Sequence, residues 1–128
     1  MTAGSFNITK LAESQPGGAF DLVIIDECAQ ATEPDAWIPL KLTKKAIFAG
    51  DHKQLEPVVK SMRAVDMGLS NTLFEQIMEQ FPQVSKMLKI QHRMNNQIMK
   101  WSSETMYNNE LKASDHVKDH LLGDSELK

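Results

Sequence analysis

Apolar and polar residues alternate in blocks along the chain, and these blocks predict the strands and helices of an α/β fold. Two short apolar runs, residues 20–25 and 46–49, are bounded by polar residues and predict buried strands of a parallel sheet. Residues 86–90 alternate enough between apolar and polar side chains to indicate a third strand. Helical patterns follow each of these segments, and such strand–helix alternation favours parallel pairing.

The helix expected after the first strand begins at a residue typical of helix starts. Thr32 lies two residues before Pro34, and proline suits the first turn of a helix. We expect this short helix to bring Trp37 and Leu40 onto the sheet and to end near Pro39.

Two longer helices are predicted further along the chain. Thr72 and Glu75 have the spacing of a capping box, which opens a helix that ends before Pro82. A last amphipathic helix is expected from about residue 95 to 107. The side chains expected to be buried are Leu73, Phe74, Ile77, Met78 and Phe81 in the first, and Met94, Ile98, Trp101 and Met106 in the second. Three strands with so few helices make a thin sheet, which is typical of part of a larger domain.

Polar side chains follow the first two predicted strands at the point where each strand ends. Asp26 and Glu27 come directly after one strand, and Gly50, Asp51 and Gln54 come after the next. Ligands of open α/β sheets bind at the carboxyl ends of such strands. We therefore expect the acid pair and the amide to reach a common point.

The residue types at this point suit the hydrolysis of a phosphoanhydride, which needs a divalent metal, an oriented water and positive charge. Asp26 can hold Mg²⁺, and Glu27 can take a proton from the attacking water. The amide of Gln54 both donates and accepts, so it can position water or touch a γ-phosphate. Arg93, which follows the third predicted strand, can neutralise the transferred phosphoryl group. The set is typical of a nucleoside triphosphatase.

Other interpretations stay open for the same residues. Singly, the acid pair could be a solvated loop, Gly50 a strand-ending turn and Arg93 a surface residue. Asp51 and Lys53 have the acid-x-lysine form of metal-dependent nucleases, with Asp26 as the upstream acid. A non-catalytic interaction module derived from an enzyme is a third hypothesis.

The amino-acid composition indicates an ordinary globular domain, but it does not show which reaction or ligand the protein has. The 128 residues are 41% hydrophobic and 24% charged, as in ordinary globular domains. The net charge is −3 and each half carries seven lysine or arginine residues, so charge alone does not indicate nucleic-acid binding. The single cysteine, Cys28, suits a reducing compartment, and we expect it to be a small buried residue. No apolar run approaches the roughly 20 residues of a membrane span, and no signal peptide is evident, so we expect a cytoplasmic or nuclear protein.

Three segments resemble the motifs of a known family. They read DECAQATEP, GDHKQLEPVV and QHRMNNQIMKWSSETMY, and they resemble motifs II, III and IV of the Upf1-like superfamily-one helicases, in particular the immunoglobulin mu-binding protein type. The similarity covers about residues 20–122. It implies a 5′-to-3′ RNA/DNA helicase with two RecA-like domains, ATP and Mg²⁺ in the cleft between them, and single-stranded RNA or DNA as partner.

The resemblance also implies a role for each matching position. Asp26 becomes the Mg²⁺ ligand and Glu27 the catalytic base. Gln54 becomes the γ-phosphate sensor that couples hydrolysis to nucleic-acid binding. Arg93 becomes the arginine finger from the second RecA-like domain. His92 stands where the family usually has a tyrosine that stacks on adenine.

The resemblance covers only part of the family's pattern. No GxxxxGK[ST] phosphate loop occurs in the sequence. We therefore expect a partial RecA-like, P-loop NTPase-type three-layer fold that lacks the phosphate-loop half. In it, residues 1–19 form a leader or linker, 20–90 the latter half of the first RecA-like domain and 91–128 the start of the second. We expect these 128 residues alone to bind ATP poorly and to hydrolyse none.

Overall fold

The computed structural model divides the chain into two compact units, Met1–Val84 and Ser85–Lys128. The structure describes residues 10, 14 and 20–121. The leader or linker expected at residues 1–19 therefore lies, apart from two positions, outside the described residues.

A parallel pair of strands forms the centre of the first unit. β1 (Val23–Ile25) pairs with β2 (Ala46–Phe48), and Ile24 lies opposite Ile47 in the register. Both strands fall within the apolar runs at 20–25 and 46–49, and the predicted parallel pairing is confirmed. A short 3-10 helix, η2 (Cys28–Gln30), follows β1 two residues after its end.

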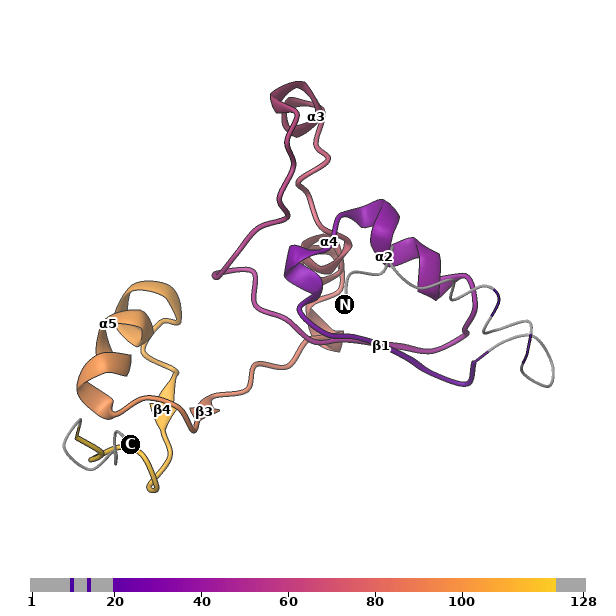
Figure 1. Ribbon diagram of the computed structural model, residues 1–128. Helices are drawn as coiled ribbons and strands as arrows, with labels where there is room; N and C mark the ends of the chain where they lie inside the picture. The colour runs from indigo at the N-terminus through magenta and orange to yellow at the C-terminus, as the bar shows by residue number, and fades with distance from the viewer. Residues whose placement is uncertain (1–9, 11–13, 15–19, 122–128) are drawn as a thin grey trace, which may run out of the picture. The chain divides into compact units, whose positions relative to one another are not determined.

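The helix between the two strands is α2 (Glu33–Leu40), which begins after Thr32 as predicted and contacts β1 (Figure 1). Its buried residues are Ala36 and Pro39, so the expectation that Trp37 would lie on the sheet is wrong. The Trp37 side chain is 45% exposed, because its indole N–H donates to the Glu33 carboxylate one turn earlier and holds the ring along the helix surface.

The helix predicted from its capping box is α4 (Leu73–Gln80). The hydroxyl oxygen of Thr72 accepts the Glu75 N–H at 3.1 Å, and the Glu75 carboxylate accepts the Thr72 N–H at 3.3 Å. Thr72 is only 1% exposed, so these bonds replace water at a buried helix start. Pro82 begins a short 3-10 helix, η3 (Pro82–Val84), after α4 has ended.

The segment before α4 contains a single turn of helix. This is α3 (Met62–Asp66), and the hydroxyl oxygen of Ser61 accepts the Ala64 N–H at its start.

The second unit has its own pair of parallel strands. β3 (Ile90–Gln91) pairs with β4 (Lys112–Ala113), whereas a single longer strand at 86–90 was expected. The prediction that this strand extends a three-stranded sheet is therefore wrong. Its partner comes from a polar segment whose side chains carry no strand pattern.

Helix α5 (Asn96–Met106) connects β3 to β4 and begins after the N-cap residue Asn95, close to its predicted bounds. Its buried residues are Met99 and Ser103, whereas Ile98 and Trp101 are 64% and 63% exposed. The predicted buried face is therefore wrong, because β4 and its preceding loop contact the neighbouring face of the helix. Within residues 20–121, no helix combines the length and the apolar character needed to cross a membrane.

Candidate functional site

The ends of β1 and β2 stay paired beyond the strands themselves. The Ala49 N–H donates to the Ile25 carbonyl at 2.9 Å, and the Cys28 N–H donates to the Ala49 carbonyl at 3.0 Å. These two bonds bring Ile25 and Cys28 alongside Ala49, and we call the two segments that meet there, residues 25–30 and 49–54, the strand-end junction. Asp26, Glu27 and Gln54 all belong to it.

Gly50 lies where the two segments of the junction approach most closely. A Cβ atom at this position would lie 2.9 Å from the Cys28 sulfur and 3.0 Å from the Ala29 backbone nitrogen. Contacts this short leave room only for glycine. Cys28 is 3% exposed, as expected of a small buried residue, and this burial raises the pKa of its thiol to about 11.

The acid pair has an unusual backbone conformation. Glu27 lies in the left-handed region with φ 52° and ψ 37°, which costs a non-glycine residue about 1–3 kcal/mol and is found preferentially at functional sites. The Glu27 N–H donates to Asp26 Oδ1 at 3.0 Å. The Gln30 amide donates to Glu27 Oε2 at 3.1 Å. Both carboxylates are exposed, so they can reach a ligand while their orientation is restrained.

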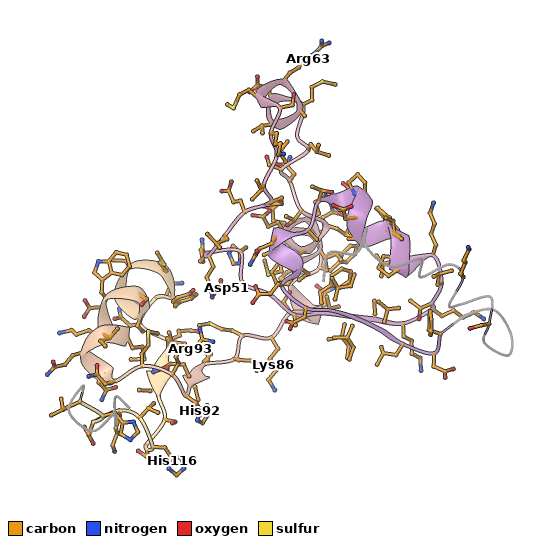
Figure 2. All side chains as sticks on the ribbon, in the orientation of Figure 1. Asp51, Arg63, Lys86, His92, Arg93 and His116 are labelled. Atoms are coloured by element: carbon orange, nitrogen blue, oxygen red, sulfur yellow. The ribbon has the colours of Figure 1, made fainter. Side chains whose placement is uncertain are left out.

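The loop after β2 restrains Gln54 in a similar way. The side-chain nitrogen of Gln54 donates to Asp51 Oδ2 at 2.7 Å, and the Lys53 N–H donates to Asp51 Oδ1 at 3.0 Å. Figure 2 shows Asp51 in this loop. The His52 ring lies against Phe74 of α4, with ring centroids 6.5 Å apart, so the loop is attached to a helix that also contacts η2.

The donor set at the junction fits a magnesium ion that comes with a nucleotide. Asp26 supplies one exposed carboxylate, of which Oδ1 already accepts a hydrogen bond. In the part of the chain that the structure describes, no three acidic, histidine or cysteine side chains gather into a metal site. Mg²⁺ in nucleotide sites is held by one or two carboxylates, with phosphates and waters completing its shell. The single carboxylate of Asp26 therefore suits a magnesium ion that is bound together with a nucleotide. It does not suit a metal ion that is held by protein ligands alone.

The other two candidate residues belong to the second unit. His92 and Arg93 directly follow β3 and are both exposed (Figure 2). The Arg93 N–H donates to the side chain of Gln91, which also donates to the Met94 carbonyl, so Gln91 shapes this turn. Among the described residues, no carboxylate forms an ion pair with the Arg93 guanidinium. The structure thus places Asp26, Glu27 and Gln54 in the first unit, and His92 and Arg93 in the second.

The structure adds two side-chain contacts that were not predicted from the sequence. Gln30 donates to Glu27, and Asp51 accepts from Gln54. In each case a carboxylate and an amide lie three residues apart, a spacing visible in the sequence. A cavity of about 710 Å³ also opens in the first unit, but it is lined by α2 and residues 64–71 and by none of the junction residues.

Comparison with known proteins places the chain in a family. Residues 1–62 match one model of an AAA domain, and residues 69–127 match a second model that is also described as an AAA domain. The mixed helices and parallel strands are those of a partial α/β RecA-like fold.

Curated relatives specify the family further. The chain is 47% identical over 110 residues to the DNA-binding protein SMUBP-2 of Rattus norvegicus, a match that covers 85% of the chain and 11% of the relative. It is 44% identical over 113 residues to an uncharacterized ATP-dependent helicase of Methanocaldococcus jannaschii, covering 88% of the chain and 17% of the relative. It is 43% identical over 113 residues to the DNA polymerase alpha-associated DNA helicase A of Saccharomyces cerevisiae, covering 82% and 16%.

The chain belongs to the Upf1-like family of superfamily-one helicases. It spans between 11% and 17% of the length of these three relatives.

Proposed function

We propose that the chain forms part of the ATP-hydrolysis site of a helicase that moves 5′-to-3′ on RNA or DNA. This part would hold the metal ion and the attacking water. In this assignment residues 20–90 are the latter half of a first RecA-like domain, and residues 91–128 are the start of a second. The relative from Methanocaldococcus jannaschii is named an ATP-dependent helicase and the rat relative a DNA-binding protein, which supports ATP and single-stranded nucleic acid as ligands.

The observation that carries the proposal is the pairing across the strand-end junction. Two backbone hydrogen bonds, of 2.9 and 3.0 Å, tie the residues around the acid pair to Ala49, and Gln54 follows a few residues later. A carboxylate pair and an amide at the carboxyl ends of adjacent parallel strands lie where α/β proteins bind ligands.

Each junction residue has a task that its contacts suit. Asp26 would hold the magnesium ion, which when bound stabilises negative charge on the phosphates. Glu27 would accept the proton of the attacking water through its carboxylate, while Gln30 fixes the orientation of that carboxylate through Oε2. Gln54 would contact the terminal phosphoryl group with its amide.

The second unit would supply the remaining groups. The Arg93 guanidinium would neutralise charge on the transferred phosphoryl group, and its exposure and lack of an ion pair among the described residues suit that task. The His92 ring would stack on adenine, where a flat ring is needed. The association of the yeast relative with DNA polymerase alpha, given in its name, supports a cytoplasmic or nuclear location.

The 128 residues alone are expected to bind ATP weakly and not to hydrolyse it. The sequence contains no GxxxxGK[ST] motif, so it has no backbone cradle and lysine for the β- and γ-phosphates. Magnesium-dependent phosphate release by the isolated chain would contradict this.

A segment exchange tests the proposal in an active protein. The matching segment of the yeast DNA helicase A is replaced by that of this chain, and ATP hydrolysis and DNA unwinding are measured. The exchanged protein should hydrolyse ATP, and Glu27→Gln should reduce the rate by about 100-fold or more while nucleotide binding persists. Equal rates with and without Glu27→Gln would refute the assigned base.

The same protein tests the nuclease hypothesis. Both oxygens of Asp51 accept hydrogen bonds within their own loop, which makes this carboxylate a poor second metal ligand. DNA cleavage with Mg²⁺ and without ATP, lost on Asp51→Asn, would favour a nuclease instead.

A further inference from the structure

A short hydrogen bond inside the strand-end junction joins Asp51 to Gln54. The distance from the Gln54 side-chain nitrogen to Asp51 Oδ2 is 2.7 Å, short for a bond between an amide and a carboxylate. The bond occupies the very side chain that the proposed function assigns to the terminal phosphoryl group.

The geometry shows which of the two partners is free to move. Asp51 Oδ1 accepts the Lys53 N–H at 3.0 Å, and the Asp51 carbonyl accepts the Gln54 N–H at 3.2 Å, so the carboxylate is part of a local turn. The loop backbone is further attached to α4 through the ring contact between His52 and Phe74. The Gln54 side chain is exposed, and its amide can swing away without disturbing this turn.

We propose that Asp51 is a positioning residue that competes with the terminal phosphoryl group of ATP for the Gln54 amide. This inference rests on the proposed function. In the nucleotide-free protein the carboxylate holds the amide, and on nucleotide binding the amide transfers to a phosphoryl oxygen.

The competition follows from where the hydrogen bond holds the Gln54 amide. While its nitrogen lies 2.7 Å from Asp51 Oδ2, the amide is directed toward its own loop, so it must leave Asp51 before it can reach a phosphoryl oxygen. Repulsion between the carboxylate and the phosphoryl group, both anions, adds to this effect but is not its main part. A net hydrogen bond of ordinary strength lowers nucleotide affinity by about fivefold when it must first be broken.

Two substitutions separate the hydrogen bond from the charge. D51A removes both the acceptor and the charge, whereas D51N keeps an acceptor oxygen for the amide and removes only the charge. D66A, an exposed aspartate in α3, is the matched control for an aspartate-to-alanine change outside the junction. All variants are made in the 128-residue chain, and the dispersion of their ¹⁵N–¹H spectra confirms that they fold alike.

The first measurement is the side-chain amide resonance of Gln54 without nucleotide. We expect it to lie downfield of the amides of exposed glutamines such as Gln80 and Gln97, and to move to their position in D51A. It should stay in place in D66A and move only partly in D51N. A Gln54 resonance that is the same in the unsubstituted chain and in D51A would overturn the proposal.

The second measurement is a titration with Mg²⁺·ATP into the millimolar range, followed by the same resonances. We expect D51A to bind about fivefold more tightly than the unsubstituted chain, and D51N to gain clearly less. If nucleotide binds clearly but D51A and the unsubstituted chain have equal affinities, the competition is overturned and the nucleotide site is not. If D51A and D51N gain the same affinity, the effect comes from the charge of Asp51 alone, and the competition for the amide is overturned as well. Absence of any nucleotide-dependent shift in every variant would overturn the proposed nucleotide site together with the competition.

Discussion

A methyl group at position 50 should force the strand-end junction apart. In Gly50→Ala the new Cβ would lie 2.9 Å from the Cys28 sulfur, 3.0 Å from the Ala29 nitrogen and 3.1 Å from the Cys28 nitrogen. Two of these three atoms are backbone, and the sulfur is buried, so no flexible side chain can move out of the way. The two segments must separate by several tenths of an ångström, and overpacking of this kind costs about 1–3 kcal/mol.

Tryptophan fluorescence measures this cost in the unit concerned. The chain has two tryptophans, Trp37 in the first unit and Trp101 in the second, so a W101F background leaves one reporter on the junction's own unit. Urea unfolding of Gly50→Ala in this background should show a free energy of unfolding lower by about 1–3 kcal/mol.

Gly68→Ala is the matched control. Its φ of +90° also disfavours an L side chain, so this variant should lose stability as well. Only Gly50→Ala, however, should shift the backbone resonances of Asp26 and Glu27. If Gly50→Ala unfolds at the same urea concentration as the parent, or leaves those resonances unchanged, the close approach inferred at the junction is wrong.

Three further substitutions or reactions test the contacts around the junction. Thr72→Ala should lower the free energy of unfolding by about 1–2 kcal/mol because it removes a buried capping box, and urea unfolding should find Thr72→Ser nearly unchanged. Two hydrogen bonds lower the pKa of the Glu33 carboxyl from 4.5, chiefly the one from Gln76 and to a smaller extent the one from Trp37. The ionised Glu33 carboxylate therefore stabilises the fold above pH 4.5, and this contribution is lost as the pH falls through the lowered pKa. Gln76→Ala should raise the Glu33 pKa, as measured by a ¹³C titration. An unchanged pKa would rule this contact out. Cys28 is buried, so mass spectrometry should find it alkylated by iodoacetamide only at the rate at which the first unit opens, and immediate labelling would show that it is exposed.

Elements defined by neighbouring residues were predictable from the sequence. The capping box of α4 needs only Thr72 and Glu75, and both of its hydrogen bonds form. The strands β1 and β2 were predictable because each is a short apolar run with polar residues on both sides. Such signals depend only on residues close together in the sequence, so they can be recognised without knowing the tertiary structure around them.

The pairing of β3 could not be predicted in the same way. It is held by backbone bonds from Lys112 to the Lys89 carbonyl at 2.7 Å and from Ser114 to the Gln91 carbonyl at 2.9 Å. Backbone groups are alike in every residue, so side-chain patterns do not reveal this partner. The face of α5 escaped prediction for a related reason, because the Ser103 hydroxyl donates to the Leu111 carbonyl and turns that face inward.

At the candidate site, the residue types and their order along the chain could be predicted, but their restraints could not. The spacing of the acid pair after β1 gave no sign that Glu27 has a left-handed backbone. Nor did it show that Gly50 is packed against Cys28, since that contact depends on how two strands end side by side. The bonds that orient Glu27 and Gln54 depend on rotamers of exposed side chains, which a sequence pattern does not specify.

In the proposed site, the acid pair and the Gln54 amide face one ligand at the strand-end junction. Manganese in place of magnesium, added with ATP to the ¹⁵N-labelled chain, shows whether they do, since the paramagnetic ion broadens the resonances of nearby groups. We predict broadening of the Asp26 and Glu27 backbone amides together with the Gln54 side-chain amide, and its loss in Asp26→Asn. A sharp Gln54 signal beside a broadened acid pair, or broadening that survives Asp26→Asn, would contradict the account.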